Sequence, residues 1–211
     1  AVREEFLNRF CAAIGELPFG MPWQDGVKLT PLPDPAMAKN HAALVADAQQ
    51  FGARVLNEDG GTVNRTFFYP AVVYPVDERM RLYHEEQFGP TIPVASFSDI
   101  ETPIQYIVES NYGQQASIFG TDPDVIAALV DPLVNQVCRL NINSQCQRGP
   151  DVFPFTGRKD SAEGTLSVSD ALRVFTIRTL VAAKHNTLNN TLVTDIVRER
   201  KSNFLSTDFI L

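Results

Sequence analysis

The sequence predicts an α/β protein with a mostly parallel sheet flanked by helices. Three observations lead to this class: short apolar runs that suit buried strands, capped helix-forming stretches between them, and a regular alternation of the two. A helix between two strands carries the chain back across the sheet, so the alternation favours parallel pairing. The 211 residues are 44% hydrophobic and 20% charged, which fits a folded globular protein and excludes predominant disorder.

The first quarter of the chain predicts two helices joined by an irregular segment. Residues 2–17 place apolar side chains at three- and four-residue spacing, which predicts an amphipathic helix ending at the next proline. Five prolines and two glycines within residues 18–35 forbid a helix and indicate an extended surface segment. An Asp-Pro pair is typical of a helix start, so a second helix is expected over residues 34–50, with Gly52 as its stop.

The pattern then changes to short apolar runs. Residues 53–56 and 67–73 predict strands, and the Gly-rich stretch at residues 58–61 predicts a turn between them. A short helix is expected over residues 79–86, and the apolar run at residues 92–97 predicts a buried strand.

The alternation that favours parallel pairing is clearest in the next segment. Helices are expected over residues 99–110 and 122–133, each opened by an aspartate that can cap it. Strands are expected over residues 116–119 and 137–142. Residues 149–164 are rich in glycine, proline and charge, which predicts a structured loop.

The C-terminal part is expected to contain a β-branched strand over residues 174–183 and then a polar tail. Leu192, Ile196 and Val197 predict a short helix in that tail.

Charge and cysteine content exclude several classes of function. The formal net charge of −7 argues against nucleic acid as a main partner, because phosphate binding needs a basic surface. No apolar run approaches the roughly 20 residues of a membrane-spanning helix. Cys11, Cys138 and Cys146 are too few for a disulfide framework and lack zinc-binding spacing, so no metal is expected. Cys138 and Cys146 could pair in principle, but a reduced, cytoplasmic protein is the plainer interpretation.

Two adjacent acids before a rigid turn form the first candidate site. Glu85 and Glu86 precede Phe88, Gly89 and Pro90, so the turn can direct one carboxylate and one aromatic ring into a cleft. A carboxylate suits sugar hydroxyls, and a ring suits a flat heteroaromatic group. The alternative is a solvated pair of acids next to a core phenylalanine.

The second candidate site is the loop that contains Arg148. Glycine and proline stiffen residues 147–151, so the planar guanidinium could hold a phosphate or a carboxylate. The alternative is a surface ion pair between Arg148 and Asp151.

The histidines and Cys146 are weaker candidates. His41, His84 and His185 lie far apart, and none has a carboxylate at a diagnostic offset. Cys146 lies in a polar loop without an identifiable base, so an ordinary thiol is the favoured interpretation.

Four motifs in order resemble those of the aldehyde dehydrogenase superfamily. They are His84-Glu85-Glu86-Gln87-Phe88-Gly89-Pro90, Asn111-Tyr112-Gly113 with Ala116-Ser117-Ile118-Phe119, Ile142-Asn143, and Phe155 with Gly157, Lys159 and Ser161. Two further segments resemble the NADP-dependent, non-phosphorylating glyceraldehyde-3-phosphate dehydrogenase branch of that family: residues 22–33, and Gln147-Arg148-Gly149-Pro150-Asp151 with Phe153-Pro154-Phe155. The resemblance covers about residues 1–185 and implies the C-terminal catalytic-domain segment of the aldehyde dehydrogenase fold.

The resemblance implies a role for four residues. Glu86 would bond the nicotinamide-side ribose, and Phe88 would pack near the nicotinamide ring of NADP, with NAD as the alternative cofactor. Arg148 would hold the phosphate of a small phosphorylated aldehyde, and Phe155 would line the aldehyde pocket. The parent reaction would convert glyceraldehyde 3-phosphate to 3-phosphoglycerate in glycolysis. The alternatives are a dehydrogenase of a carboxylated aldehyde and a non-catalytic structural or assembly module.

The family's reaction needs a nucleophilic cysteine and a general-base glutamate. The Gly-Gln-x-Cys run that carries this nucleophile does not occur in the chain, which begins at Ala1 within a helical pattern. We therefore expect a truncated or processed chain that contains no catalytic residue and is inactive alone. The expected organisation is a partial catalytic domain over residues 1–165, an oligomerisation strand segment over residues 166–185 and a tail of unassigned role over residues 186–211. The parent is expected to be a homodimer or homotetramer.

Overall fold

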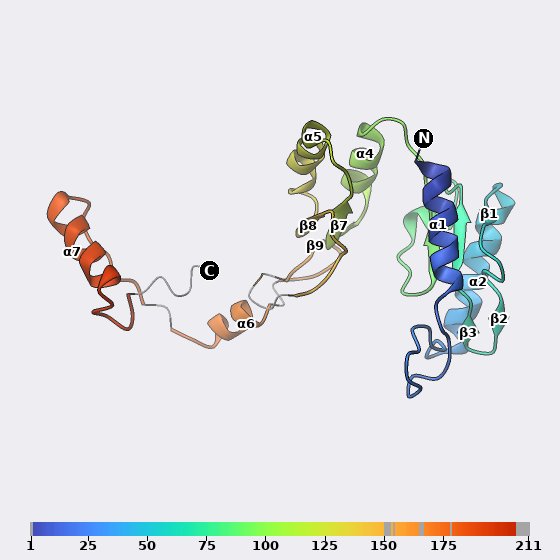
Figure 1. The fold of residues 1–211 in the computed structure, drawn as a ribbon, viewed down its shortest axis with the longest axis horizontal. Helices are drawn as coiled ribbons and strands as arrows, with labels where there is room; N and C mark the ends of the chain where they lie inside the picture. The colour runs from blue at the N-terminus through green and yellow to red at the C-terminus, as the bar shows by residue number, and fades with distance from the viewer. Residues whose placement is uncertain (1, 150–152, 154, 165–166, 178, 206–211) are drawn as a thin grey trace. The chain divides into compact units, whose positions relative to one another are not determined.

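The computed structural model describes residues 2–149, 153, 155–164, 167–177 and 179–205. The chain forms two compact units. The first contains residues 1–146 together with 157–163, and the second contains residues 147–156 together with 164–211. Helices and strands are interspersed along the chain, and they alternate most regularly between β4 and β8 (Figure 1), so the α/β class predicted from the sequence is confirmed.

The helices are α1 (Arg3–Gly15), α2 (Pro35–Gln50), α3 (Arg81–His84), α4 (Glu101–Glu109), α5 (Pro123–Leu133), α6 (Val168–Val174) and α7 (Thr187–Arg198). The strands are β1 (Arg54–Val55), β2 (Val63–Asn64), β3 (Phe67–Phe68), β4 (Ala71–Tyr74), β5 (Thr91–Pro93), β6 (Tyr112–Gly113), β7 (Gln115–Ile118), β8 (Arg139–Ile142) and β9 (Arg158–Lys159).

Strand β4 is the centre of a three-stranded sheet with the order β1-β4-β5. It pairs antiparallel with β1 and parallel with β5. Because successive side chains of a strand point to opposite faces, Ala71 and Val73 pack in the core beneath α2, whereas Val72 packs with Leu7 and Ile14 of α1. The two N-terminal helices therefore cover opposite faces of this sheet (Figure 1).

Two of the three helix starts predicted from a capping aspartate are confirmed, whereas the N-cap of α4 is Ile100 and not Asp99. The side chain of Asp34 accepts a hydrogen bond from the backbone N–H of Ala36 at 2.7 Å and so caps α2. Asp122 caps α5 in the same way. Gly52 follows α2 with φ +98°, a left-handed conformation that stops a helix at little cost in glycine.

The predicted strand over residues 67–73 is wrong as a single element. Pro70 has no N–H to donate to a sheet, and the chain divides there into β3 and β4. Strand β3 pairs instead with β2 in a short hairpin that the sequence did not indicate. The strand expected over residues 92–97 is also shorter, because β5 ends at Pro93 and the ring of Phe97 is exposed.

A second parallel pair lies further along the chain. Strands β7 and β8 pair in parallel over their full lengths, and α5 forms the crossover between them. The antiparallel pair β6–β9 joins Tyr112 to Lys159 and Gly113 to Arg158. This pair brings a loop from far along the sequence beside the residues that follow α4.

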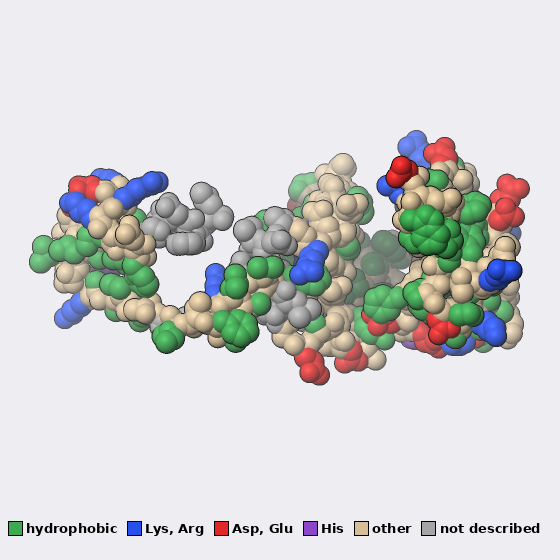
Figure 2. Space-filling view, turned by 90° about the horizontal axis from the view of Figure 1, so that it is seen from below, with side chains coloured by type: hydrophobic (Ala, Val, Ile, Leu, Met, Phe, Trp, Pro, Cys, Tyr) green, Lys and Arg blue, Asp and Glu red, His purple; other side chains and the backbone are tan. Residues whose placement is uncertain are grey.

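The strand predicted over residues 174–183 is not formed. Helix α6 extends to Val174, and the described residues between it and α7 pair with no strand. A strand needs the backbone of a neighbour for its hydrogen bonds, and the described residues supply none here. Figure 2 shows hydrophobic side chains exposed along this C-terminal segment, and Ile177 is 96% exposed. The helix expected around residues 192–197 is confirmed as α7.

Candidate functional site

The first predicted site follows α3. Its two adjacent acids, Glu85 and Glu86, have different surroundings. Glu85 forms a bidentate ion pair with Arg81, with N···O distances of 2.6 and 2.9 Å. The hydrogen bonds from this guanidinium lower the pKa of the Glu85 carboxyl. Glu86 instead lines an open cleft, as does Phe88, whose ring is 77% exposed. The alternative of a core phenylalanine is therefore wrong.

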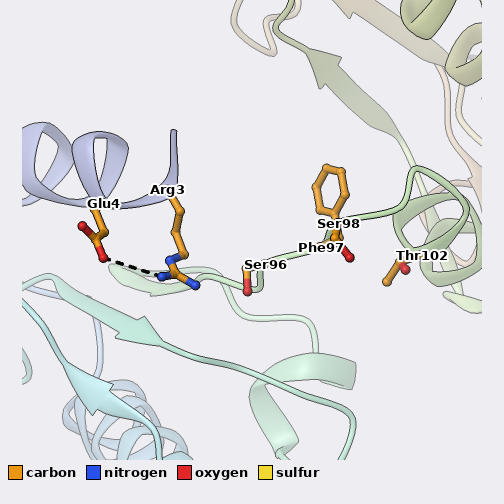
Figure 3. A pocket seen from close by; sticks show the side chains of 6 residues that line it. All are labelled: Arg3, Glu4, Ser96, Phe97, Ser98 and Thr102. Carbon is orange, nitrogen blue, oxygen red and sulfur yellow. Dashed lines mark ion pairs between the residues drawn. The ribbon is translucent and has the colours of Figure 1, made fainter. Parts of the chain in front are cut away.

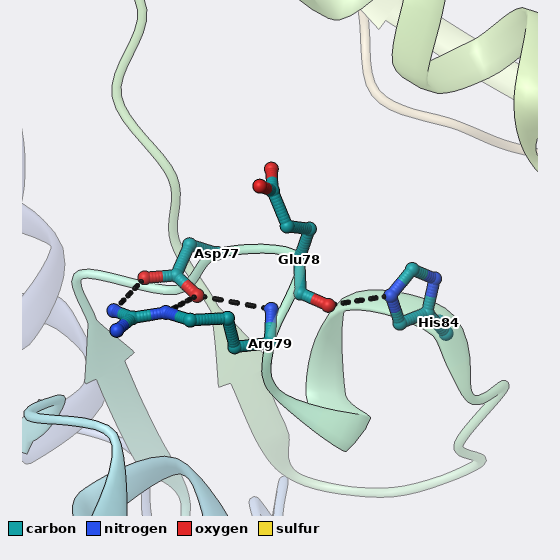
Figure 4. Close-up of polar contacts among 4 residues, drawn as sticks. All are labelled: Asp77, Glu78, Arg79 and His84. Atoms are coloured by element: carbon teal, nitrogen blue, oxygen red, sulfur yellow. Dashed lines mark hydrogen bonds and ion pairs between the residues drawn. The ribbon is translucent and has the colours of Figure 1, made fainter.

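Polar contacts fix the loop that leads into α3 (Figure 4). The guanidinium of Arg79 donates to both carboxylate oxygens of Asp77, at 3.0 and 2.6 Å, and thereby lowers the pKa of that carboxyl. The Nε2 atom of the His84 ring lies 2.8 Å from the backbone oxygen of Glu78. His84 thus has a local structural contact and does not line the cleft.

The cleft has a volume of about 450 Å³ and collects residues from three of the four sequence motifs. Its lining is Glu86, Phe88, Tyr106, Ile107, Ser110, Tyr112, Gly113, Gln114, Gln115, Ala116, Val137, Cys146 and Ser161. Aromatic and aliphatic groups form much of the wall, and a few polar groups converge on it, which is the usual composition of a small-molecule site. Burial raises the pKa of the Tyr106 hydroxyl, so this phenol stays neutral at pH 7.

Gly113 is the point where two motifs meet. Its backbone N–H donates to the hydroxyl of Ser161 at 2.9 Å. A Cβ on Gly113 would overlap the backbone oxygen of Gln136 and press on the backbone of Arg158. The close approach of these segments therefore requires glycine, and it closes one end of the cleft.

Lys159 joins the same loop to the end of α4. Its ammonium donates to the carbonyl oxygens of Ile107, Val108 and Ser110 at 2.7, 3.0 and 2.8 Å. These carbonyls lie at the helix C-terminus, where a positive charge is favourable. Lys159 has φ +55°, a strained value for a residue with a Cβ, and the charge-assisted hydrogen bonds offset that strain.

The Ile-Asn motif at the end of β8 also has a structural explanation. Asn143 has φ +48°, and its side-chain amide exchanges two hydrogen bonds of 2.9 Å with the backbone of Gly120. Asparagine tolerates this left-handed conformation. These hydrogen bonds hold together the segments that follow the parallel strands β7 and β8.

Cys146 was expected to be an ordinary thiol in a polar loop, and it lines the cleft. Its thiol lies 3.3 Å from the hydroxyl of Ser117 and 3.8 Å from the side-chain nitrogen of Asn141. Cys138 and Cys146 are both free, so they do not form a disulfide. The β8 end that carries Cys146 could have indicated this position, because parallel strands present their carboxyl ends at one edge.

The second predicted site lies in the C-terminal unit. The guanidinium carbon of Arg148 lies 5.3 Å from the centre of the Phe155 ring, a cation–π contact that brings these two predicted residues together. Pro150, Asp151 and Pro154 lie outside the described residues, and with them the alternative pairing of Arg148 to Asp151.

A second pocket, of about 620 Å³, contains none of the predicted site residues (Figure 3). It is lined by Arg3, Glu4, Ser96, Phe97, Ser98 and Thr102. Its cation, Arg3, lies 3.7 Å from the carboxylate of Glu4, which offsets the charge available for a ligand. The motif-lined cleft is therefore the better candidate for a functional site.

Among the described residues, no group of three His, Cys, Asp or Glu side chains is arranged to hold a metal ion. Over the same residues, no helix has the length and apolar character needed to cross a membrane.

This fold and cleft correspond to a known class of oxidoreductase. The model of the aldehyde dehydrogenase family matches residues 1–181, so the chain belongs to the aldehyde dehydrogenase family. The chain is 31% identical over 179 residues to the NADP-dependent glyceraldehyde-3-phosphate dehydrogenase of Streptococcus equinus, a match that covers 83% of this chain and 36% of the relative.

Two solved structures support the same fold. The NADP-dependent glyceraldehyde-3-phosphate dehydrogenase of Bacillus halodurans C-125, complexed with NADP, has a TM-score of 0.75 and 31% identity, covering 81% of this chain and 35% of that one. The succinate-semialdehyde dehydrogenase of Burkholderia pseudomallei has a TM-score of 0.71 and 28% identity, covering 78% of this chain and 34% of that one. The chain thus spans about a third of the length of these relatives.

Proposed function

We propose that this chain supplies the nicotinamide-side cofactor contacts and the substrate-phosphate loop of an NADP-dependent dehydrogenase that oxidises glyceraldehyde 3-phosphate to 3-phosphoglycerate. The observation that carries the proposal is the joint placement of Glu86 and Phe88 in one cleft with Gly113 and Ser161. Relatives in two comparisons are NADP-dependent glyceraldehyde-3-phosphate dehydrogenases.

The residues of the cleft fit the ribose and nicotinamide of such a cofactor. The carboxylate of Glu86 is not taken up by Arg81, whose guanidinium is paired with Glu85, so it can accept hydrogen bonds from the two hydroxyls of a ribose. The exposed ring of Phe88 offers a flat apolar surface for a nicotinamide ring. When bound, the cofactor would accept the hydride from the substrate.

In the C-terminal unit, Arg148 and Phe155 suit the binding of a phosphorylated substrate. A guanidinium can hold a phosphate through two parallel hydrogen bonds, and the ring beneath it restrains its orientation. Phe155 adds apolar surface for the short carbon chain of the aldehyde.

A second candidate substrate is a carboxylated aldehyde. The similarity to a succinate-semialdehyde dehydrogenase favours it, because a carboxylate presents the same two oxygens to a guanidinium as a phosphate does. The two candidate substrates differ in charge, because a phosphate carries nearly twice the charge of a carboxylate at pH 7.

The test is ligand binding to the 211-residue chain, followed by nuclear magnetic resonance of its backbone amides. NADP is expected to shift the signals of Phe88 and Gly113, and 3-phosphoglycerate those of Arg148 and Gly149. Glu86→Gln should weaken NADP binding about tenfold, because a charge-assisted hydrogen bond is lost. Glu58→Gln removes the same charge at an exposed position outside the cleft and should leave NADP affinity unchanged.

The substrate assignment depends on the comparison of two probes. Arg148→Ala should weaken 3-phosphoglycerate binding more than succinate binding. If succinate depends on Arg148 more strongly, the carboxylated aldehyde is the substrate. If neither probe binds, and NADP leaves Phe88 unmoved, the non-catalytic assembly module becomes the better explanation.

We further propose that the chain alone has no dehydrogenase turnover, because the Gly-Gln-x-Cys nucleophile motif is missing from its 211 residues. A purified preparation of verified mass, mixed with NADP and glyceraldehyde 3-phosphate, should show no growth of NADPH absorbance. We also propose a cytoplasmic, homo-oligomeric parent.

A further inference from the structure

A buried histidine lies directly behind the turn that presents Glu86 and Phe88. His41 belongs to α2, is only 2% exposed and does not line the cleft. Its Nδ1 atom lies 2.9 Å from the hydroxyl oxygen of Thr91, the first residue of β5. Its ring also packs against Phe68, with the ring centres 5.4 Å apart.

The other edge of the imidazole faces the turn itself. Nε2 of His41 is the nearest atom to the position that a Cβ would occupy on Gly89, and the two would overlap. Gly89 does not have a positive φ, so the requirement for glycine at this position comes from the histidine and not from the backbone conformation. The contacts with Thr91 and Phe68 restrain the ring on its other sides.

The protonation state of the ring follows from these contacts. Burial lowers the pKa of His41, and a hydrogen bond with the backbone of Phe88 opposes this effect. The ring is therefore neutral at pH 7 and carries one proton. If the Thr91 hydroxyl donates to Nδ1, that proton lies on Nε2, where it can be donated to the carbonyl of Phe88.

The residue after the turn is fixed independently. The backbone N–H of Ala71 in β4 donates to the carbonyl of Pro90 at 2.9 Å. The turn thus has one hydrogen bond to the sheet at Pro90 and one close contact with the His41 ring of α2 at Gly89.

We propose that His41 is a positioning residue, which sets the path of the Phe88-Gly89 backbone and thereby directs Phe88 and Glu86 into the cleft. The cofactor consequence rests on the proposed function above. The positioning itself does not, because it concerns only contacts within the chain.

The first test needs no substitution. Nitrogen-15 chemical shifts of the His41 ring at pH 7 should show a proton on Nε2 and none on Nδ1. A proton on Nδ1 would overturn the proposal, because Nε2 would then have nothing to donate to the Phe88 carbonyl.

The second test uses substitutions of the ring. Glutamine places an amide N–H near the position of Nε2, whereas alanine removes it. His41→Ala should displace the amide signals of Phe88 and Gly89 and weaken NADP binding about fivefold, the value of one lost hydrogen bond. His41→Gln should restore both readouts. Leu44→Ala, a fully buried change one turn along α2, should lower stability without displacing those signals.

The outcomes separate the positioning role from the proposed function. If Leu44→Ala displaces the turn signals as much as His41→Ala, or if His41→Gln fails to restore them, His41 has only a general structural role. If the turn signals respond as expected but wild-type chain shows no NADP-dependent shift, the positioning role is supported and the cofactor role of this turn is wrong.

Discussion

A Cβ added at Gly113 would push apart the two segments that meet at this residue of the cleft wall. The glycine gives its N–H to Ser161 and lies against the backbone oxygen of Gln136. Backbone atoms on both sides of a gap cannot give way as a flexible side chain can. The sequence motif showed that a glycine stands here, but only the structure shows which atoms require it.

We expect Gly113→Ala to destabilise the N-terminal unit by about 3 kcal/mol, the upper part of the range for overpacking, because the contact is with backbone. Gly15→Ala is the matched control. Its Cβ would have no atom within 4 Å, and alanine favours a helix, so stability should rise slightly. Urea unfolding of both variants measures the difference. Equal stability of the two variants would contradict the packing at Gly113.

A second prediction at the residue scale concerns pH. The folded-state pKa of His41 is below its ordinary value of 6.5, so the unfolded chain binds a proton first as the pH falls. The free energy of unfolding should therefore fall as the pH drops through about 6.5, by up to about 1.4 kcal/mol per pH unit, until the folded-state pKa is reached.

His41→Gln should remove this dependence. Asp77 and Glu85 do not interfere, because their arginine partners lower their pKa values and confine their titration to more acidic solution. Equilibrium unfolding at a series of pH values between 5 and 8 provides the measurement. A slope that persists in the variant would show that another group titrates in this range.

The side chains of the first site were predictable because the motif is local. Glu86 and Phe88 stand two residues apart before a rigid Gly-Pro step, and the structure places both in the cleft. The pairing of Glu85 with Arg81 and the contact of His41 with Thr91 were not predicted. The first depends on where α3 begins, and the second joins residues that are far apart in the sequence.

At the scale of elements, α4 is held at its C-terminus by a side chain from β9. The ammonium of Lys159 satisfies carbonyl groups that a helix end leaves without an intrahelical partner. Strands β6 and β9 pair beside this contact. The wall of the cleft therefore depends on an element that the chain reaches only after the Arg148 loop.

Lys159→Met should destabilise the N-terminal unit by roughly 2 kcal/mol, because charge-assisted hydrogen bonds are lost while the strained backbone remains. Hydrogen exchange of the α4 amides should accelerate locally. Lys28→Met, at an exposed lysine of the proline-rich segment, serves as the control and should change neither quantity. If α4 exchanges at the wild-type rate in Lys159→Met, the clamp does not stabilise the helix.

Element prediction succeeded where a local signal marked the boundary. Aspartate caps located α2 and α5, and apolar runs located β7 and β8. It failed over residues 174–183, where β-branched side chains suit a strand but no described part of the chain pairs with this segment. Strand propensity reflects the side chains of a segment, whereas a strand forms only when a neighbouring backbone supplies its hydrogen-bond partners.

At the scale of the whole molecule, the two units differ in how far they bury their apolar side chains. The N-terminal unit buries its aliphatic residues between helices and sheet. In the C-terminal unit, Phe175 and Leu180 are more than four-fifths exposed, and α7 contains no buried residue. Exposed apolar surface of this kind is typical of association sites.

The proposed oligomer leads to a prediction about truncation. Removal of residues 186–211 should leave the association state unchanged, whereas removal of residues 166–211 should yield monomers, because we propose that residues 166–185 form the oligomerisation segment. Sedimentation velocity of the three chains makes the comparison. Urea unfolding should show the same stability for the N-terminal unit within about 0.5 kcal/mol in each chain. Monomers in all three preparations would rule out this role for the segment.

The discontinuous make-up of the N-terminal unit has a consequence for its biosynthesis. Residues 157–163 belong to that unit although the Arg148 loop precedes them. While a ribosome is still adding the loop, the edge of β6 has no partner and the last carbonyls of α4 lack their lysine. Domains usually fold as they leave the ribosome, but this cleft can close only after residue 163 has emerged. A nascent chain stalled before that point would expose the unclosed wall to chaperones and proteases.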